Sequence, residues 1–307
     1  MGRYFVKRIV GTVPLMLIIS FIIFMFIHMI PGDPARLMAG KDATMEEISL
    51  TRHTLGLDKP LLNQYLDYLG RLLHGDLGNS STTRQSVAQM LVPRFKPTFT
   101  LAGCAMLWSL VIGVALGVFS AVKRSKWQDY LGMLIAISGI SIPGFWLGLI
   151  LIQWFSVQLG WLPTGGLDSF RSYILPSFTL GTGIMAVLAR FSRSSMLENM
   201  KEDYVRTARA KGQKESMVVL RHAFRNSLIQ VVTVAGLQIG GLLAGSVLVE
   251  TVFTIPGLGR LLIESISFRD YPVIQAELLL FSFEFIIINL IVDLLYCVLN
   301  PKIRYES

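Results

Sequence analysis

The chain has 307 residues, of which 52% are hydrophobic and only 16% charged, and its mean hydropathy is +0.56. Soluble domains carry about 25% charged residues, so the composition excludes an ordinary soluble protein and indicates an integral membrane protein. The apolar runs described next predict an all-α fold. The formal net charge of +8 does not predict nucleic-acid binding, because the basic residues gather in short segments beside apolar runs, where they orient a chain in the membrane.

Six apolar runs are long enough to cross a bilayer. The first is too long for the apolar part of a signal peptide, so we interpret it as a retained membrane helix. The third is interrupted at Pro143, whose missing backbone donor predicts a kink. We expect six transmembrane helices, at about residues 9–30, 97–122, 130–156, 173–189, 227–249 and 272–299.

A polar segment, residues 31–96, separates the first two spans. It begins with two prolines flanking Gly-Asp, which cannot continue a helix, and helical stretches are predicted at residues 44–55 and 61–73. Its apolar content is too high for a disordered linker, so we expect a small folded extracytoplasmic insertion. The predicted division of the chain is residues 1–30 (N-terminal cytoplasmic tip and first span), 31–96 (insertion), 97–299 (core of five spans, including a cytoplasmic loop at 192–226) and 300–307 (cytoplasmic tail).

The distribution of basic residues orients the six spans. Seventeen lysines and arginines fall at the predicted inner positions, and three fall in the two short outer loops, residues 159–172 and 251–271. Cytoplasmic loops of membrane proteins are enriched in these residues. Both termini are therefore predicted to be cytoplasmic.

One polar stretch, residues 198–226, lies within the apolar second half of the chain. With the two arginines that precede it, the stretch holds nine basic and four acidic residues. Residues 203–210 are predicted to form a short helix that ends at Gly212, and residues 215–224 a second helix. Charge placement alone does not require a helix of small residues, so we interpret Thr207, Ala208 and Ala210 as a narrow knob that docks into a groove of another protein. The alternative is a loop that only sets topology.

Carboxylates within membrane spans are functional candidates, because an unpaired buried charge is costly. Glu277 and Glu284 are seven residues apart and share a helix face. They are candidates for lining a polar path or for contacting a neighbouring subunit, unless they lie nearer to the interface than the predicted span suggests. Asp293 is expected to pair with an inner-surface basic residue such as Arg304.

Enzyme motifs are missing from the sequence, which contains no HExxH, GxSxG or phosphate-binding loop. The four histidines do not share a helical spacing, so no metal site is predicted. We expect a transport protein without catalytic activity of its own. Energy for uphill transport would come from a partner or from an ion gradient.

The polar stretch resembles the inner loop of the membrane subunit of bacterial ATP-binding-cassette (ABC) importers, in particular the dipeptide, oligopeptide, nickel and glutathione permease family. The resemblance is carried by DYVRTARAKG at residues 203–212 and LRHAFRN at residues 220–226. Further matches to that family lie at residues 31–35, 55–58, 75–78, 256–260, 269–272 and 300–304.

The resemblance implies a type I ABC-importer permease, the first of two permease types, which forms half of a pathway for a small peptide-like solute. Its implied partners are a second permease subunit in a heterodimer, two ATP-binding subunits, an extracytoplasmic solute-binding protein and membrane lipid. No cofactor is expected on this chain, since ATP and Mg would be bound by the partners, and no metal site is implied. The implied location is the bacterial inner membrane. The residues implied to couple to the ATPase are Asp203, Tyr204, Arg206, Thr207, Ala208, Arg209, Ala210, Lys211, Gly212, Arg221, His222 and Arg225.

The sequence also departs from the family pattern. Arg206 stands where the general importer motif has glutamate, and Gln230 where many relatives have proline. The pattern does not account for Glu277 and Glu284. We expect that a bulky or charged side chain at Ala208 or Gly212 abolishes transport, because their small size would serve docking.

Two other functions remain open at this stage. The same architecture could import nickel or a metal chelate. A secondary transporter or channel driven by an ion gradient through Glu277 and Glu284 is the competitor of another class, although the two halves of the chain show no internal repeat of the kind common in such transporters. A membrane-embedded enzyme is less favoured still, because no nucleophile and base motif is present.

Overall fold

The computed structural model describes residues 2–29, 34–39, 43–54 and 56–299, with the backbone alone described at residues 2–9, 34, 37, 38 and 293–299. The predicted pairing of Asp293 with Arg304, the motif at residues 300–304 and the cytoplasmic tail at 300–307 lie outside what is described. Within these ranges the regular elements are helices, with one isolated β-bridge between Asn79 and Ser86. The expectation of an all-α protein is confirmed.

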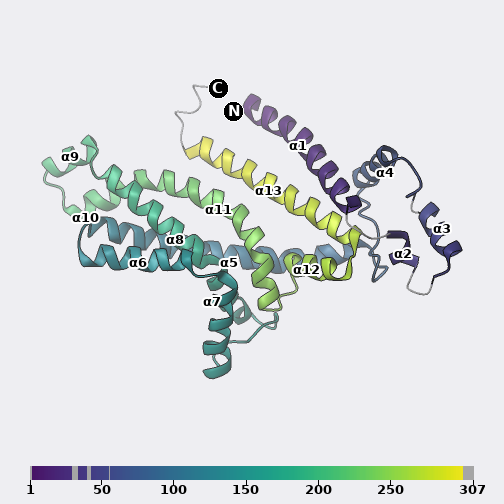
Figure 1. Cartoon of the computed structure of the whole chain (residues 1–307). Coiled ribbons are helices and arrows are strands. Elements are labelled where there is room, and N and C mark those ends of the chain that lie inside the picture. The colour runs from purple at the N-terminus through teal and green to yellow at the C-terminus, as the bar shows by residue number, and fades with distance from the viewer. Residues whose placement is uncertain (1, 30–33, 40–42, 55, 300–307) are drawn as a thin grey trace. The chain divides into compact units, whose positions relative to one another are not determined.

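Thirteen labelled α-helices occur in the described part of the chain, supplemented by two π-helical segments and one 3₁₀ turn (Figure 1). The α-helices are α1 (Gly2–Met29), α2 (Pro34–Ala39), α3 (Met45–Thr54), α4 (Leu61–Leu73), α5 (Val87–Val122), α6 (Trp127–Ser141), α7 (Gly144–Leu151), α8 (Ile174–Asn199), α9 (Asp203–Ala210), α10 (Glu215–Met217), α11 (Arg225–Val252), α12 (Leu258–Phe268) and α13 (Tyr271–Leu299). The π-helical segments are Ile152–Gln158 after α7 and Val218–Phe224 after α10, and the 3₁₀ turn is Phe170–Tyr173.

Five stretches of the described helices are long and apolar enough to cross a membrane, and a bent pair formed by α6 and α7 brings the number to six. Three of these helices extend beyond the predicted spans. The second span begins at Val87, the fourth ends at Asn199 and the fifth begins at Glu215. Each helix continues past its apolar part through charged residues, which had bounded the predicted span. The outer loop after the fifth span also contains a helix, α12, which was not predicted.

The kink predicted at Pro143 is a turn of 102° between α6 and the helix that starts with α7 (Figure 1). Ile142 has an extended backbone, with φ −86° and ψ 123°. The ring of the following proline disfavours helical geometry at this residue. Pro143 then precedes the first turn of α7, where its missing N–H leaves no hydrogen bond unmade.

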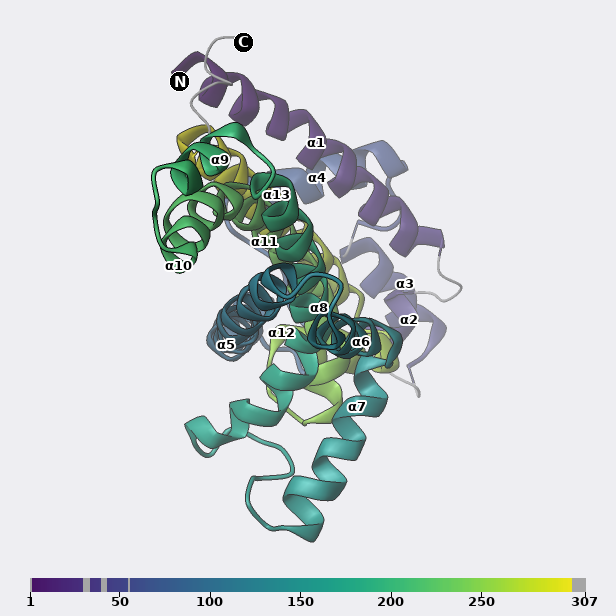
Figure 2. The ribbon, with the colours of Figure 1, turned by 90° about the vertical axis from the view of Figure 1, so that its left-hand side faces the viewer.

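The described chain divides into two compact units. One comprises Pro97–Gly259 together with the chain from Ile287 onward, and the other comprises Gly2–Lys96 and Arg260–Ile286. In the first unit α8 packs against α6 and α11 (Figure 2). Gly113 and Gly117 let α5 approach α8, because a Cβ at these positions would lie 2.7 Å from the carbonyl oxygen of Met185 and 2.4 Å from that of Ala189.

The second unit contains the insertion between the first two spans. The helices predicted at residues 44–55 and 61–73 are observed as α3 and α4. The hydroxyls of Ser20 on α1 and Tyr65 on α4 are hydrogen-bonded at 2.9 Å. Asp270, the residue before α13, accepts a hydrogen bond from the Ser80 hydroxyl and one of 2.9 Å from the Ser81 N–H. The insertion is therefore attached to two membrane helices by buried polar contacts.

Candidate functional site

The polar stretch singled out in the sequence forms a short helix between two long ones. We call residues 200–214 the α9 loop. Helix α9 spans Asp203–Ala210, as predicted, and Gly212 follows it with φ +74°. The Gly212 N–H donates to the Arg209 carbonyl at 2.9 Å, and the Gln213 N–H donates to the Ala208 carbonyl at 3.4 Å. This pair of hydrogen bonds is the Schellman arrangement, whose left-handed residue is usually glycine.

One face of α9 is buried within its own chain. Val205 and Ala208 are 0% and 5% exposed and pack against Met196 of α8 and against Val218 and Ala223 of the following helix. The small side chain at Ala208 therefore fits the core of this unit and does not lie on the exposed face of α9, where the sequence analysis placed it as part of a knob. Sequence alone could not show which face of so short a helix is covered.

The opposite face of α9 is exposed. It presents side chains from residues predicted to couple to an ATPase: Asp203, Tyr204, Arg206, Thr207, Arg209, Ala210 and Lys211. Arg206 lies 3.5 Å from Asp203, and both side chains are largely exposed, so this ion pair contributes little to stability. A partner would meet mainly cationic and small side chains here.

Two contacts attach α9 to the helix that follows it. Arg209 donates two hydrogen bonds to Glu215, from Nη2 to Oε1 at 2.7 Å and from Nε to Oε2 at 3.1 Å. The Nε2 atom of His222 lies 2.9 Å from the Oε1 atom of Gln213. Paired guanidinium and carboxylate groups have a fixed mutual orientation. Arg209 therefore braces the α9 loop internally as well as lying on its exposed surface.

The helix after the α9 loop is continuous with the fifth span. It runs from Glu215 through the π-helical segment Val218–Phe224 and on to Val252. The sequence had predicted a separate short helix at residues 215–224. Arg221 and Arg225 are exposed on this extension, and His222 is half-buried. The α9 loop is thus followed directly by a helix long enough to cross the membrane.

A second ion pair near the same end of this unit was missed in the sequence. Arg193 on α8 donates to both carboxylate oxygens of Asp129 on α6, each at 2.7 Å. The Ser125 N–H donates to the same carboxylate at 3.1 Å, and the side chain of Asp129 is only 3% exposed. A lone acid three residues after the basic cluster at residues 123–126 was the available sequence signal. The pair joins α6 to the helix that leads into the α9 loop.

Comparison with known proteins assigns the chain to a family. Residues 113–305 match the family described as binding-protein-dependent transport system inner membrane component, and residues 1–102 match its N-terminal region. The chain belongs to this family. As a binding-protein-dependent permease it lies in the inner membrane, and the family implies substrate-binding and ATPase partners.

Two relatives of this permease match it over its full length. The glutathione transport system permease protein GsiC of Pectobacterium atrosepticum is 55% identical over 306 residues, covering 100% of both chains. The protein of the same name in Escherichia coli strain K12 is 54% identical over 306 residues, again covering 100% of both.

Solved structures show the fold of the permease. The MetNI methionine ABC transporter, in an inward-facing conformation, has a TM-score of 0.60 at 20% identity and covers 69% of this chain and 97% of that chain. An amino acid ABC transporter has a TM-score of 0.53 at 16% identity, covering 68% and 94%. The predicted fold, that of a type I ABC-importer permease, is confirmed.

The two membrane carboxylates of the permease lie on α13. Both side chains are buried, with Glu277 0% and Glu284 6% exposed. Contact of either carboxylate with a neighbouring subunit stays a prediction. A role in a polar path stays a prediction. Among the described residues, no three His, Cys, Asp or Glu side chains gather into a group that could hold a metal ion.

Proposed function

We propose that this chain forms half of the translocation pathway of an ATP-driven importer for a small peptide-like solute, either a di- or oligopeptide or glutathione. The names of the two full-length relatives, glutathione transport permeases, support this class of solute. The chain would bind no cofactor itself. ATP and Mg would be held by two ATP-binding subunits, and a second permease subunit would complete the pathway as a heterodimer.

The α9 loop is the proposed point of contact with an ATPase. The observation that carries this proposal is that α9 is anchored on one face and exposed on the other. A helix anchored in this way can transmit force, whereas a loop that only sets topology needs no such anchor. The exposed Arg206, Thr207 and Ala210 would meet the ATPase, and Arg221 and Arg225 would flank the contact.

The proposed transmission follows the two helices next to the α9 loop. When the ATPases close on ATP, they would displace α9 together with Glu215, because Arg209 ties the two together. The continuous helix from Glu215 to Val252 would tilt, and α8 would move with it. The pair Asp129–Arg193 would carry the movement of α8 to α6. Access to the pathway would change as these helices change their tilt.

An uptake assay tests the proposed function. The complete importer would be expressed in bacteria that lack other glutathione and peptide importers, with uptake of labelled glutathione, labelled dialanine and ⁶³Ni²⁺ measured separately. We expect uptake of glutathione or dialanine that stops when ATP is depleted while the membrane potential is maintained. Uptake of nickel alone would refute the solute class. Uptake that persists without ATP would refute the ATP-driven mechanism and favour an ion-gradient transporter.

A further inference from the structure

The second unit contains a polar cavity of about 890 Å³. Its wall is formed by the end of α1, by α4 with the segment that follows it, and by the first turns of α13. Small-molecule sites in proteins usually have volumes of about 300–1,000 Å³ and a few convergent polar groups. The size of the cavity therefore suits a small solute.

Three polar side chains of the cavity wall, those of Tyr68, Tyr271 and Gln275, have buried atoms that make no hydrogen bond of good geometry with the described residues. The hydroxyl of Tyr271 is buried and, among the described residues, has no hydrogen-bond partner, while the residue as a whole is 7% exposed. Gln275 lies one turn further along α13, and its side chain interacts with that of Tyr68. Neither the amide nitrogen of Gln275 nor the hydroxyl of Tyr68 makes a hydrogen bond of good geometry. Burial raises the pKa of Tyr68, so its hydroxyl remains a proton donor.

Buried donors without partners are uncommon, because each loses its hydrogen bonds to water on folding. Two hydroxyls and an amide N–H₂ in one wall are complementary to carbonyl and carboxylate oxygens. A ligand with such oxygens would replace the missing partners. The three groups thus define the chemistry of an occupant.

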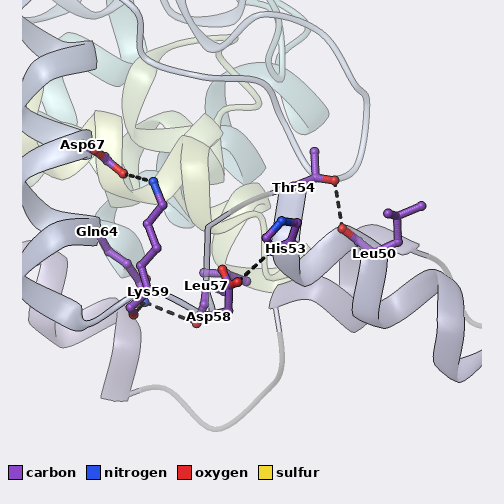
Figure 3. A network of polar contacts seen from close by, with 8 residues as sticks. All are labelled: Leu50, His53, Thr54, Leu57, Asp58, Lys59, Gln64 and Asp67. Atoms are coloured by element: carbon purple, nitrogen blue, oxygen red, sulfur yellow. Dashed lines mark hydrogen bonds and ion pairs between the residues drawn. The ribbon is translucent and has the colours of Figure 1, made fainter.

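Other charged side chains of the wall have partners within the protein, some of which are drawn in Figure 3, and the Asp76 carboxylate accepts a hydrogen bond of 2.9 Å from the Gly78 N–H. Lys59 and Asp67 form an ion pair of 2.7 Å, and His53 lies 2.7 Å from Asp58. Gln64 donates to the Lys59 carbonyl at 2.8 Å, which fixes the loop between α3 and α4.

Arg71 on α4 differs from these groups. It lines the cavity, its side chain is exposed, and the part of the chain that is described offers it no carboxylate partner. Guanidinium groups bind carboxylates through two parallel hydrogen bonds. Arg71 therefore supplies the charge that a carboxylate-bearing solute requires.

We propose that this cavity is a binding site for a small carboxylate-bearing solute of the peptide class, with Arg71 holding a carboxylate and Tyr271, Gln275 and Tyr68 donating to carbonyl oxygens. The choice of solute class, and the position of the cavity outside the membrane, rest on the proposed function. The site adds a point of recognition on the permease itself to that expected on the separate binding protein.

Equilibrium dialysis tests the site. The purified complex of permeases and ATPases, in lipid nanodiscs without binding protein and without ATP, would be dialysed against labelled glutathione and labelled dialanine. We expect saturable binding of at least one probe, and no binding when its carboxylates are amidated. Arg71→Gln is expected to weaken binding about tenfold and Tyr271→Phe about fivefold, which are the losses typical of one charge-assisted and one neutral hydrogen bond.

Two matched variants serve as controls. Arg36→Gln changes an exposed arginine on α2 that does not line the cavity, and Tyr130→Phe changes an exposed tyrosine on α6. Both should bind as the unchanged protein does. Tyr271→Phe removes a hydroxyl that has no partner, so the melting temperature of the ligand-free complex should stay equal or rise while binding weakens. A lower melting temperature would contradict the assignment, because it would show that the hydroxyl is used within the protein.

The outcomes separate this site from the proposed function. The site would be overturned if binding were saturable but equal in all variants. It would also be overturned if a complex that imports glutathione or dialanine bound neither probe. Both outcomes would leave the proposed function standing. Binding that depends on Arg71 in a complex that imports neither probe would support the site and refute the proposed cargo.

Discussion

The carboxylate of Glu250 occupies the space into which a side chain at residue 257 would project. A Cβ at Gly257 would lie 2.4 Å from both Cδ and Oε2 of Glu250, which is fully buried. The Thr98 hydroxyl donates to Oε1 of Glu250 at 2.7 Å and accepts a hydrogen bond of 2.9 Å from the Leu258 N–H. The glycine in the matched stretch at residues 256–260 thus has a physical reason, since it lets the chain pass over a buried acid at the end of α11.

Replacing Gly257 with alanine should destabilise the protein. The methyl group would displace a buried, hydrogen-bonded carboxylate, at a cost of about 1–3 kcal/mol. Thermal melting of the purified complex measures the change. Gly241→Ala is the matched control, because a Cβ at this exposed position of α11 meets nothing within 4 Å. Equal melting temperatures for the Gly257 and Gly241 variants would contradict the contact.

The pair Asp129–Arg193 should show strong coupling in a double-mutant cycle. Arg193→Gln leaves a buried carboxylate with one remaining hydrogen bond, from Ser125, and should cost up to about 3 kcal/mol. Asp129→Asn together with Arg193→Gln should recover much of that loss, because no charge is then buried alone. The free energy of unfolding of both single variants and of the double variant gives the coupling. Additive effects would show that the two residues act independently.

Ala208 and Ala210 should respond differently to leucine, although they lie two residues apart on α9. Ala208 is buried in the core of its own unit, so Ala208→Leu should lower stability by about 1–3 kcal/mol. Ala210 is exposed, so Ala210→Leu should leave the melting temperature unchanged and reduce transport relative to ATP hydrolysis. Measuring melting temperature, ATP hydrolysis and uptake on each variant separates packing from docking. A stability loss at Ala210 with none at Ala208 would reverse the assignment of the two faces.

Gly212 should be sensitive to backbone conformation more than to side-chain size. A Cβ there meets nothing within 4 Å, but φ of +74° is strained for most residues by about 1–2 kcal/mol. Gly212→Asn should therefore be tolerated better than Gly212→Ala, since asparagine adopts this conformation more readily. Melting temperature and uptake provide the comparison. Equal loss of transport with normal stability in both variants would instead support the earlier expectation that smallness at residue 212 serves docking.

The parts of the structure that depend on local sequence were predictable. Helix α9 was predicted to the residue, because its glycine stop lies next to it in the chain, and α4 was bounded correctly by Pro60 and Gly75. The limits of the long helices were less predictable. Charged residues such as Arg94 and Lys96 marked the end of an apolar run, yet α5 continues through both.

Contacts between distant residues could not be predicted from one sequence. The buried face of α9 depends on its packing against residues of α8 and of the following helix. Thr98 and Glu250 are 152 residues apart, and Asp129 and Arg193 are 64 apart. No local pattern connects such pairs. The cavity beside Tyr271 depends in the same way on segments from α1, α4 and α13.

The contact between α9 and an ATPase is tested most directly by site-specific crosslinking in the purified, transport-competent complex. A photoactivatable phenylalanine analogue would replace Thr207, which is exposed on α9, and in a separate variant Trp161, which is 63% exposed in the predicted outer loop. The account predicts that the probe at position 207 crosslinks to an ATPase subunit, with a yield that changes on adding ATP, and that the probe at position 161 does not. No crosslink from position 207 to an ATPase in a complex that still transports would contradict the coupling role of α9.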